Sequence, residues 1–209
     1  MSRAQGPDSD PEPVAVAVLA AGGSSRLGRA KQLIEWRGDT LLRWAAKTAS
    51  SAACGPAVVV LGARALRLRR ELADLPVKIV INDYWQDGLA GSIRTALAAA
   101  RSLAPESSGI LLTLTDQPLV SVELLRELVD LHRRHPGCPI ACAYAGTVGA
   151  PALIPRELFA ELDELEGDSG ARAVLRRHRR EVIELPFPAG AHDVDTESDL
   201  DDLINHRDP

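Results

Sequence analysis

Residues 14–31 read VAVAVLAAGGSSRLGRAK, and this stretch is the most informative about the fold. Its first seven residues are all apolar and mostly small or β-branched, which is typical of a strand buried on both faces of a sheet. A turn rich in glycine and serine follows directly, and the cations Arg26 and Lys31 come a few residues later. A buried strand, a glycine-rich turn and nearby cations together predict a phosphate-binding loop at the carboxyl end of a strand.

The rest of the chain alternates between apolar runs and helical patterns, which predicts an α/β domain with a mixed, mostly parallel sheet and helices on both faces. The expected strands are 14–20, 57–61, 77–81, 109–115, 139–145, 148–154 and 181–185. The expected helices are 41–53, 63–75, 92–102, 122–135, 155–162, 167–180 and 196–205. The length of 209 residues fits one domain over 14–205 that follows a flexible tail over 1–13.

Composition excludes several classes of function. The formal net charge is −5 and aromatic residues make up 3%, so neither a basic nucleic-acid surface nor a base-stacking platform is expected. The tail over 1–13 lacks the basic start and apolar run of a signal peptide, and no apolar stretch reaches the ~18 residues that span a membrane. We therefore expect a cytoplasmic protein without nucleic-acid or membrane partners.

The loop after the first strand fits neither of two common phosphate-binding motifs. Gly23 and Gly28 have the spacing of a P-loop, but Arg29 and Ala30 stand where that motif needs lysine and a hydroxyl residue. The glycines at 22, 23 and 28 also miss the spacing of a dinucleotide-binding fingerprint, which disfavours an oxidoreductase. A plain surface loop is the remaining alternative to a phosphate cradle.

Asp116 follows the apolar strand expected over 109–115. An acid at the end of a buried strand is costly unless it is paired, solvated or bound to metal. One interpretation is a turn-capping aspartate two residues before Pro118. The other is a ligand of Mg²⁺, which prefers one or two carboxylates together with phosphate oxygens. Asp195 is the favoured second carboxylate, ahead of Asp193.

Residues 19–33, LAAGGSSRLGRAKQL, resemble the signature L-A-A-G-x-S-x-R-[ML]-G-x-x-K of the MobA-like nucleotidyltransferases. Within that group the chain is most similar to the molybdenum cofactor cytidylyltransferases. Later segments agree with the family in the same order: GLAGS at 88–92, TDQP at 115–118, GDSGAR at 167–172 and DVDT at 193–196. The resemblance implies a single Rossmann-like nucleotidyltransferase domain that joins CTP and the molybdopterin cofactor, releases pyrophosphate and uses Mg²⁺ as cofactor.

The resemblance also implies roles for individual residues, and the charges agree with several of them. The catalytic residues are Arg26, Lys31 and Asp116, and the metal ligands are Asp116 and Asp195. The nucleotide-binding residues are Leu19, Ala20, Ala21, Gly22, Gly23, Ser24, Ser25, Arg26, Lys31, Asp83, Gly88 and Ser92. The acceptor-binding residues are Gly167, Asp168, Ser169 and Arg172. The basic run over 176–180 is expected to be a solvated helix end.

Three alternatives remain open at this point. Residues 88–92 depart from the G-L-S-[ST]-S pattern of the cytidylyltransferases and end in the Ala-Gly of the guanylyltransferases, so GTP is an alternative to CTP. Another small phosphate, such as a sugar phosphate, is an alternative acceptor. A third alternative is a non-catalytic module that binds nucleotide and delivers cofactor to a molybdenum hydroxylase, which is also the expected client of the enzyme.

Overall fold

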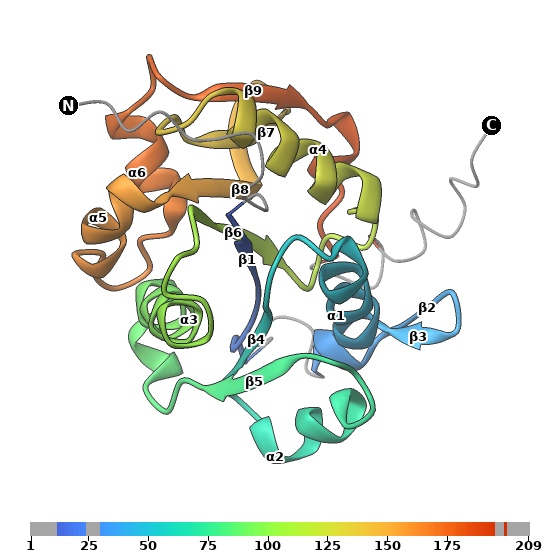
Figure 1. Ribbon diagram of the computed structural model, residues 1–209. Helices are drawn as coiled ribbons and strands as arrows, with labels where there is room; N and C mark the ends of the chain where they lie inside the picture. The colour runs from blue at the N-terminus through green and yellow to red at the C-terminus, as the bar shows by residue number, and fades with distance from the viewer. Residues whose placement is uncertain (1–11, 24–29, 195–198, 200–209) are drawn as a thin grey trace.

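The computed structural model describes residues 12–23, 30–194 and Asp199, and its centre is a seven-stranded sheet (Figure 1). The strand order is β5-β4-β1-β6-β8-β7-β9. Parallel pairs join β5 to β4, β4 to β1, β1 to β6 and β7 to β9, whereas β8 runs antiparallel to both β6 and β7. The predicted mixed, mostly parallel sheet is therefore confirmed. The strands are β1 (Val14–Ala20), β4 (Ala57–Leu61), β5 (Lys78–Ile81), β6 (Gly109–Leu114), β7 (Ile140–Tyr144), β8 (Thr147–Pro155) and β9 (Ile183–Pro186).

Helices cover both faces of the sheet, as expected. One face packs against α1 (Leu41–Ala52), α2 (Ala65–Leu68) and α4 (Val122–Arg134). The other face packs against α3 (Leu89–Leu103), α5 (Phe159–Asp163) and α6 (Ala171–Arg177), which Figure 1 shows on the opposite side. Short 3₁₀ helices are Lys31–Leu33, Arg69–Leu72, Trp85–Asp87, Arg156–Leu158 and Pro188–Ala191.

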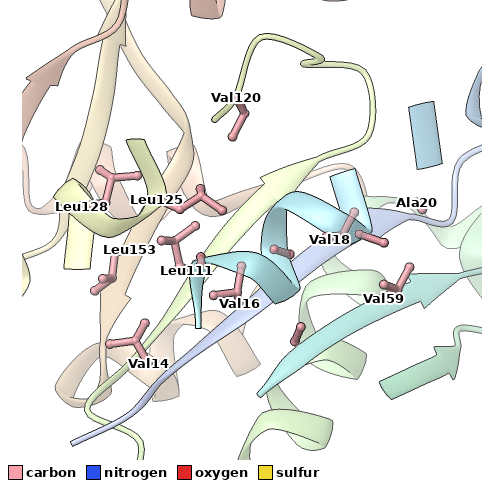
Figure 2. Packing of buried hydrophobic residues seen from close by; sticks show 14 of the residues in the cluster. Val14, Val16, Val18, Ala20, Val59, Leu111, Val120, Leu125, Leu128 and Leu153 are labelled. Carbon is pink, nitrogen blue, oxygen red and sulfur yellow. The ribbon is translucent and has the colours of Figure 1, made fainter. Parts of the chain in front are cut away.

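The first strand is the centre of both cores. Val14, Val16 and Val18 pack on the side of α1 and α4, and Figure 2 shows Val16 beside Leu111. The alternate residues of the strand pack on the side of α3. Every residue of β1 is buried, and burying a valine is worth about 1.5–3 kcal/mol relative to exposure. The strand is thus held firmly on both faces, and this fixes the place of the loop at its carboxyl end.

Side-chain hydroxyls cap the starts of two helices. The Thr40 hydroxyl accepts a hydrogen bond from the backbone N–H of Arg43 at 3.3 Å, at the start of α1. The Ser121 hydroxyl accepts one from Leu124 at 3.2 Å, at the start of α4. Each cap satisfies an N–H group that the first helical turn leaves unpaired.

The structure departs from the predicted elements in three places. A short hairpin of β2 (Glu35–Trp36) and β3 (Asp39–Thr40) was not expected, and it turns through Arg37 and Gly38, both at positive φ. The helix predicted over 63–75 was too long: α2 begins only after Arg64, which has a φ of +59°, and a 3₁₀ helix replaces it from Arg69 to Leu72. The helix predicted over 167–180 was also too long, since α6 covers only Ala171–Arg177.

Some predicted features lie outside the described residues. Of the tail over 1–13 only residues 12 and 13 are described, and of the last helix over 196–205 only Asp199 is described. Among the described residues, no helix is long and apolar enough to cross a membrane. The three cysteines are free, and only Cys142 is fully buried.

Candidate active site

The carbonyl oxygens of the loop after β1 accept hydrogen bonds from neighbouring segments. Gln32 is buried, and its Nε2 donates to the carbonyls of Ala20 and Gly22 at 3.1 and 2.7 Å. The backbone N–H of Ala63 donates to the carbonyl of Ala21 at 3.0 Å. In a trans peptide the N–H points in the opposite direction to the C=O. The N–H groups of these three peptides therefore point away from Gln32 and Ala63. Backbone N–H groups presented together in a turn bind anions.

Lys31 and Asp116 meet at the carboxyl ends of β1 and β6. Lys31 begins the 3₁₀ helix after the loop, and Asp116 is the second residue after β6. The Nζ of Lys31 lies 2.5 Å from Oδ2 of Asp116, and the two side chains are only 19% and 15% exposed. The Oδ1 of Asp116 is buried and has no hydrogen-bond partner among the described residues. The carboxylate therefore keeps one oxygen for a further cation.

The segment after β9 reaches the same place. The N–H of Val194 donates to the backbone carbonyl of Asp116 at 2.9 Å, and Val194 is buried beside Trp36. Asp193 is exposed at the edge of a cavity described below. Asp195 is the next residue along the chain, but it lies outside the described residues, as do the predicted site residues Ser24, Ser25 and Arg26.

A cavity of about 400 Å³ opens beside the ion pair. The indole of Trp85 forms part of its wall. A Cβ on Gly23 would lie 3.0 Å from the Trp85 ring, and one on Gly62 would lie 2.6 Å from the Trp85 Cβ. These two glycines therefore let the indole pack against the loop. Predicted residues in the lining are Leu19, Ala20, Ala21, Gly22, Gly23, Lys31, Gly88, Ser92 and Asp116. We call this space the nucleotide cavity.

Only part of the segment between β5 and α3 lines this cavity. Asn82 is buried, and its Nδ2 donates to the hydroxyl of Ser92 at 3.1 Å. The Oδ1 of Asn82 accepts from the N–H of Tyr84 at 3.1 Å. Asn82 thus ties the start of the segment to the first turn of α3, where Ser92 reaches the cavity. Asp83 is exposed and is not among the described residues that line it.

Gly88 and Gly167 bring the predicted nucleotide and acceptor segments into contact. Gly88 has a φ of +107°, and a Cβ there would collide with the carbonyl group of Gly167. The N–H of Ala90 donates to the carbonyl of Gly167 at 3.0 Å. The two segments lie far apart in sequence, and only a residue without a side chain permits this approach.

A second cavity, of about 590 Å³, holds three of the four predicted acceptor residues, Asp168, Ser169 and Arg172. Gly167 is not among the described residues that line it. The lining of this cavity shares Leu19, Leu89, Leu114 and Asp168 with the nucleotide cavity, so the two spaces adjoin. We call the second space the acceptor cavity. Two reactants held in adjoining cavities gain the advantage of proximity.

Three residues of the site escaped the sequence analysis. Gln32 lies inside the quoted motif, and only its burial reveals that it positions the loop. Tyr144 lines the acceptor cavity from β7, and burial raises the pKa of its hydroxyl. Arg176 was expected on a solvated helix end; it is exposed, but it lines the acceptor cavity. No local sequence signal marks Tyr144, whereas the i,i+4 spacing of Arg172 and Arg176 places them on one helix face.

The residues present fit a divalent cation held at Asp116. Among the described residues, no group of three or more His, Cys, Asp and Glu side chains gathers to form an all-protein metal site. Magnesium and similar cations need no such group when a substrate supplies phosphate oxygens. The buried Oδ1 of Asp116, which lacks a described partner, is the observation that favours a cation there.

A glycine-rich turn after β1, Lys31 beside it and an aspartate after β6, at the carboxyl edge of such a sheet, are the features expected of a nucleotidyltransferase. Comparison with known sequences gives the family: the profile of the MobA-like NTP transferase domain matches residues 16–182, and the chain belongs to that family. The family assigned by resemblance and the prediction of a nucleotidyltransferase are both confirmed. The family is generally dependent on a divalent metal.

Proteins similar to this chain carry different functional names. The nicotine blue oxidoreductase of Paenarthrobacter nicotinovorans is 34% identical over 200 residues, which cover 90% of this chain and 95% of that one. The molybdenum cofactor cytidylyltransferase of Escherichia coli (strain K12) is 24% identical over 184 residues, which cover 88% and 91%. The solved structure of Rv0371c from Mycobacterium tuberculosis H37Rv has a TM-score of 0.81 at 34% identity, covering 94% and 100%. A structure of Rv0371c in complex with manganese has a TM-score of 0.76 at 32% identity, covering 93% and 100%.

Proposed function

We propose that this protein is a CTP:molybdopterin cofactor cytidylyltransferase. The observation that carries the proposal is the Lys31–Asp116 pair beside the nucleotide cavity, which adjoins the acceptor cavity. A phosphate oxygen of the acceptor forms a bond to the α-phosphorus of CTP. The bond between the α-phosphorus and the bridging oxygen breaks, and pyrophosphate leaves with that electron pair.

The chain's own residues bind and align the two substrates. Lys31, Arg26 and the N–H groups of the first loop hold the triphosphate. The loop backbone, Gly88 and Ser92 contact the base and ribose, and Asp83 is the further candidate. Gly167, Asp168, Ser169 and Arg172 face the acceptor. The attacking phosphate is already an oxyanion at neutral pH, so alignment and neutralisation of charge suffice without a general base.

Mg²⁺ is the proposed cofactor, and Asp116 and Asp195 are its proposed ligands. When bound, the ion neutralises developing charge on the phosphates. Support comes from the buried Oδ1 of Asp116 and from Val194, whose N–H donates to the backbone carbonyl of Asp116. Asp193 and Asp195 are the sequence neighbours of Val194. Asp193 is the alternative second ligand.

The relatives support two candidates for the reaction. The similarity to the Escherichia coli cytidylyltransferase supports CTP and the molybdenum cofactor, with a molybdenum hydroxylase as the client of the product. GTP and a different small phosphate remain the alternative substrates. The 34% identity to a protein named nicotine blue oxidoreductase favours an oxidoreductase reaction as a second candidate function, although the first loop lacks the dinucleotide-binding spacing.

The decisive experiment is a pyrophosphate-release assay with purified molybdopterin cofactor and Mg²⁺, run separately with CTP, GTP and ATP. We expect release with CTP and none without the acceptor. Asp116→Asn is the matched control, because it keeps the size of the side chain and removes the charge.

Each other outcome points to a different function. Release with GTP instead moves the protein to guanylyl transfer. No release from folded protein that binds nucleotide contradicts the proposal and favours another acceptor or the delivery module. Oxidation of NADH or NADPH with nicotine blue, without pyrophosphate release, establishes the second candidate.

A further inference from the structure

The basic residues on and after α6 fall into two groups: some form ion pairs with glutamates, and others line the acceptor cavity. Arg177 forms an ion pair with a glutamate on α5 at 2.9 Å, and Arg179 forms one with a glutamate on β9 at 2.5 Å. Arg172 and Arg176, one turn apart, line the acceptor cavity instead. No carboxylate among the described residues forms an ion pair with either of them. Two cations that face a cavity without a described carboxylate partner mark a place for an anion.

Tyr144 meets Arg172 over Gly149. A Cβ on Gly149 would lie 2.5 Å from the Oη of Tyr144 and 3.0 Å from the Nη2 of Arg172. The Nε of Arg172 donates to the carbonyl of Val148 at 3.2 Å, and the hydroxyl of Tyr144 donates to the carbonyl of Ala150 at 3.0 Å. The backbone of β8 thus anchors both side chains, and the missing side chain of Gly149 gives them room to meet.

The remainder of the acceptor cavity is largely apolar. Its wall includes Leu19, Ile93, Leu112, Leu114 and Leu175, from strands β1 and β6 and helices α3 and α6. Apolar walls with a few placed polar groups are typical of sites for small organic ligands. The cavity is therefore suited to an apolar body that carries charge at one end.

Two carboxylates also line the acceptor cavity. Asp168 lines both cavities, so it stands where they join. Asp193 lines the acceptor cavity near Tyr144: burial and then the charge of Asp193 raise the pKa of Tyr144, whereas Arg172 lowers it. The positive charge of the described lining lies on α6.

We propose that Arg172, Arg176 and Tyr144 form an anion-binding face that determines acceptor specificity. The face selects an acceptor with an anionic group on an apolar body. This inference rests on the proposed function only in taking the larger cavity as the acceptor site. Arg176 and Tyr144 are the new specificity-determining residues, and Gly149 positions the face.

The test uses a probe that needs no nucleotide. Binding of 1-naphthyl phosphate and of uncharged 1-naphthol to the full chain is compared by isothermal titration calorimetry. We expect the phosphate to bind at least about tenfold more tightly, because a charge-assisted hydrogen bond is worth that much. Arg176→Ala is expected to remove about tenfold of that difference, and Arg179→Ala, with its outward ion pair, is expected to leave it unchanged.

Two conservative variants separate geometry from charge. Arg172→Lys keeps the charge but loses the planar fork of donors, and Tyr144→Phe keeps the ring but loses the hydroxyl. Both are expected to weaken the phosphate probe and to leave 1-naphthol unchanged. Thermal unfolding of each variant shows that the protein is folded in the titration.

The outcomes distinguish this inference from the proposed function. Equal affinity for the two probes, or equal effects of Arg176→Ala and Arg179→Ala, overturns the anion-binding face. Discrimination between the probes without pyrophosphate release keeps the face and contradicts the cytidylyltransferase. Pyrophosphate release without discrimination between the probes supports the cytidylyltransferase and overturns the anion-binding face.

Discussion

Lys31 binds the same carboxylate that is proposed to hold a divalent cation. Its ammonium group lies 2.5 Å from one oxygen of Asp116, while the other oxygen is buried and has no described partner. A bound triphosphate offers Lys31 a stronger negative partner than a single carboxylate does. We therefore expect Lys31 to exchange Asp116 for phosphate when nucleotide binds, which couples nucleotide binding to metal binding.

Replacing Lys31 tests this coupling. In Lys31→Met, we expect affinity for Mn²⁺ without nucleotide to rise about 3- to 10-fold, because no ammonium competes for Asp116. Affinity for CTP is expected to fall about tenfold or more, with the loss of a charge-assisted contact. Electron paramagnetic resonance measures the metal, and calorimetry measures CTP. Lys47→Met is the control, since Lys47 pairs with Asp39 outside the site; unchanged CTP affinity in Lys31→Met would contradict the phosphate role.

Asp116 is expected to serve chemistry and not folding. In Asp116→Asn, we expect pyrophosphate release to fall at least about 100-fold, since charge stabilisation by a metal site is worth several kcal/mol. Far-ultraviolet circular dichroism is expected to be unchanged. A variant that unfolds would show instead that the carboxylate is a structural partner of Lys31.

At the scale of elements, the contact between the turn before α3 and the loop before α6 depends on Gly88. We expect Gly88→Ala to lower the free energy of unfolding by about 2 kcal/mol or more, because it adds backbone strain and a collision with Gly167. CTP and acceptor binding are both expected to weaken. Gly137→Ala is the matched control, since Gly137 also has positive φ but a Cβ there meets no atom. Equal losses of stability in the two variants would show that backbone strain alone is responsible.

His178 links the end of α6 to α5, and this link depends on pH. Its Nε2 lies 2.6 Å from Oε1 of Glu161. The hydrogen bond to Glu161 raises the pKa of His178, and the bond to His178 lowers the pKa of Glu161. A raised histidine pKa gives stability that is complete below about pH 6.5 and is lost as pH rises through the raised value. A lowered glutamate pKa gives stability that is complete above about pH 4.5 and is lost as pH falls through the lowered value.

The expected difference in unfolding free energy between the wild type and His178→Gln is therefore largest between about pH 4.5 and 6.5. It is about 1 kcal/mol or less, because the pair is near the surface. Chemical denaturation at pH 6 and pH 9 measures it. A difference that grows toward pH 9 would contradict the pairing.

Most elements were predictable because their signals are local. The buried strands β1, β4 and β6 are continuous apolar runs, and the caps at Thr40 and Ser121 mark the helices that follow them. The hairpin at Arg37 and the late start of α2 at Arg64 were missed because non-glycine residues at positive φ carry no reliable sequence signal.

At the scale of the whole molecule, ligands that bind only the folded state raise its stability by mass action. At a ligand concentration of about 100 times Kd, the gain is about 2.7 kcal/mol, or roughly 5–10 °C in Tm for a chain of this size. We expect CTP with Mn²⁺ to give such a shift, and each alone to give less. Differential scanning calorimetry measures it, and equal shifts with CTP, GTP and ATP would contradict the choice of base.

From the sequence alone follow the fold class, the place of the loop after β1 and Lys31 and Asp116 as candidate site residues. These follow from periodicity and from residue types within short stretches, which act through local backbone geometry and charge. The folded chain was needed to show that Gly88 meets Gly167, that the two cavities adjoin, and that Tyr144 and Arg176 line the acceptor cavity. Those features join segments distant in the chain, and their positions depend on strand order and on the packing of α3 and α6 against the sheet.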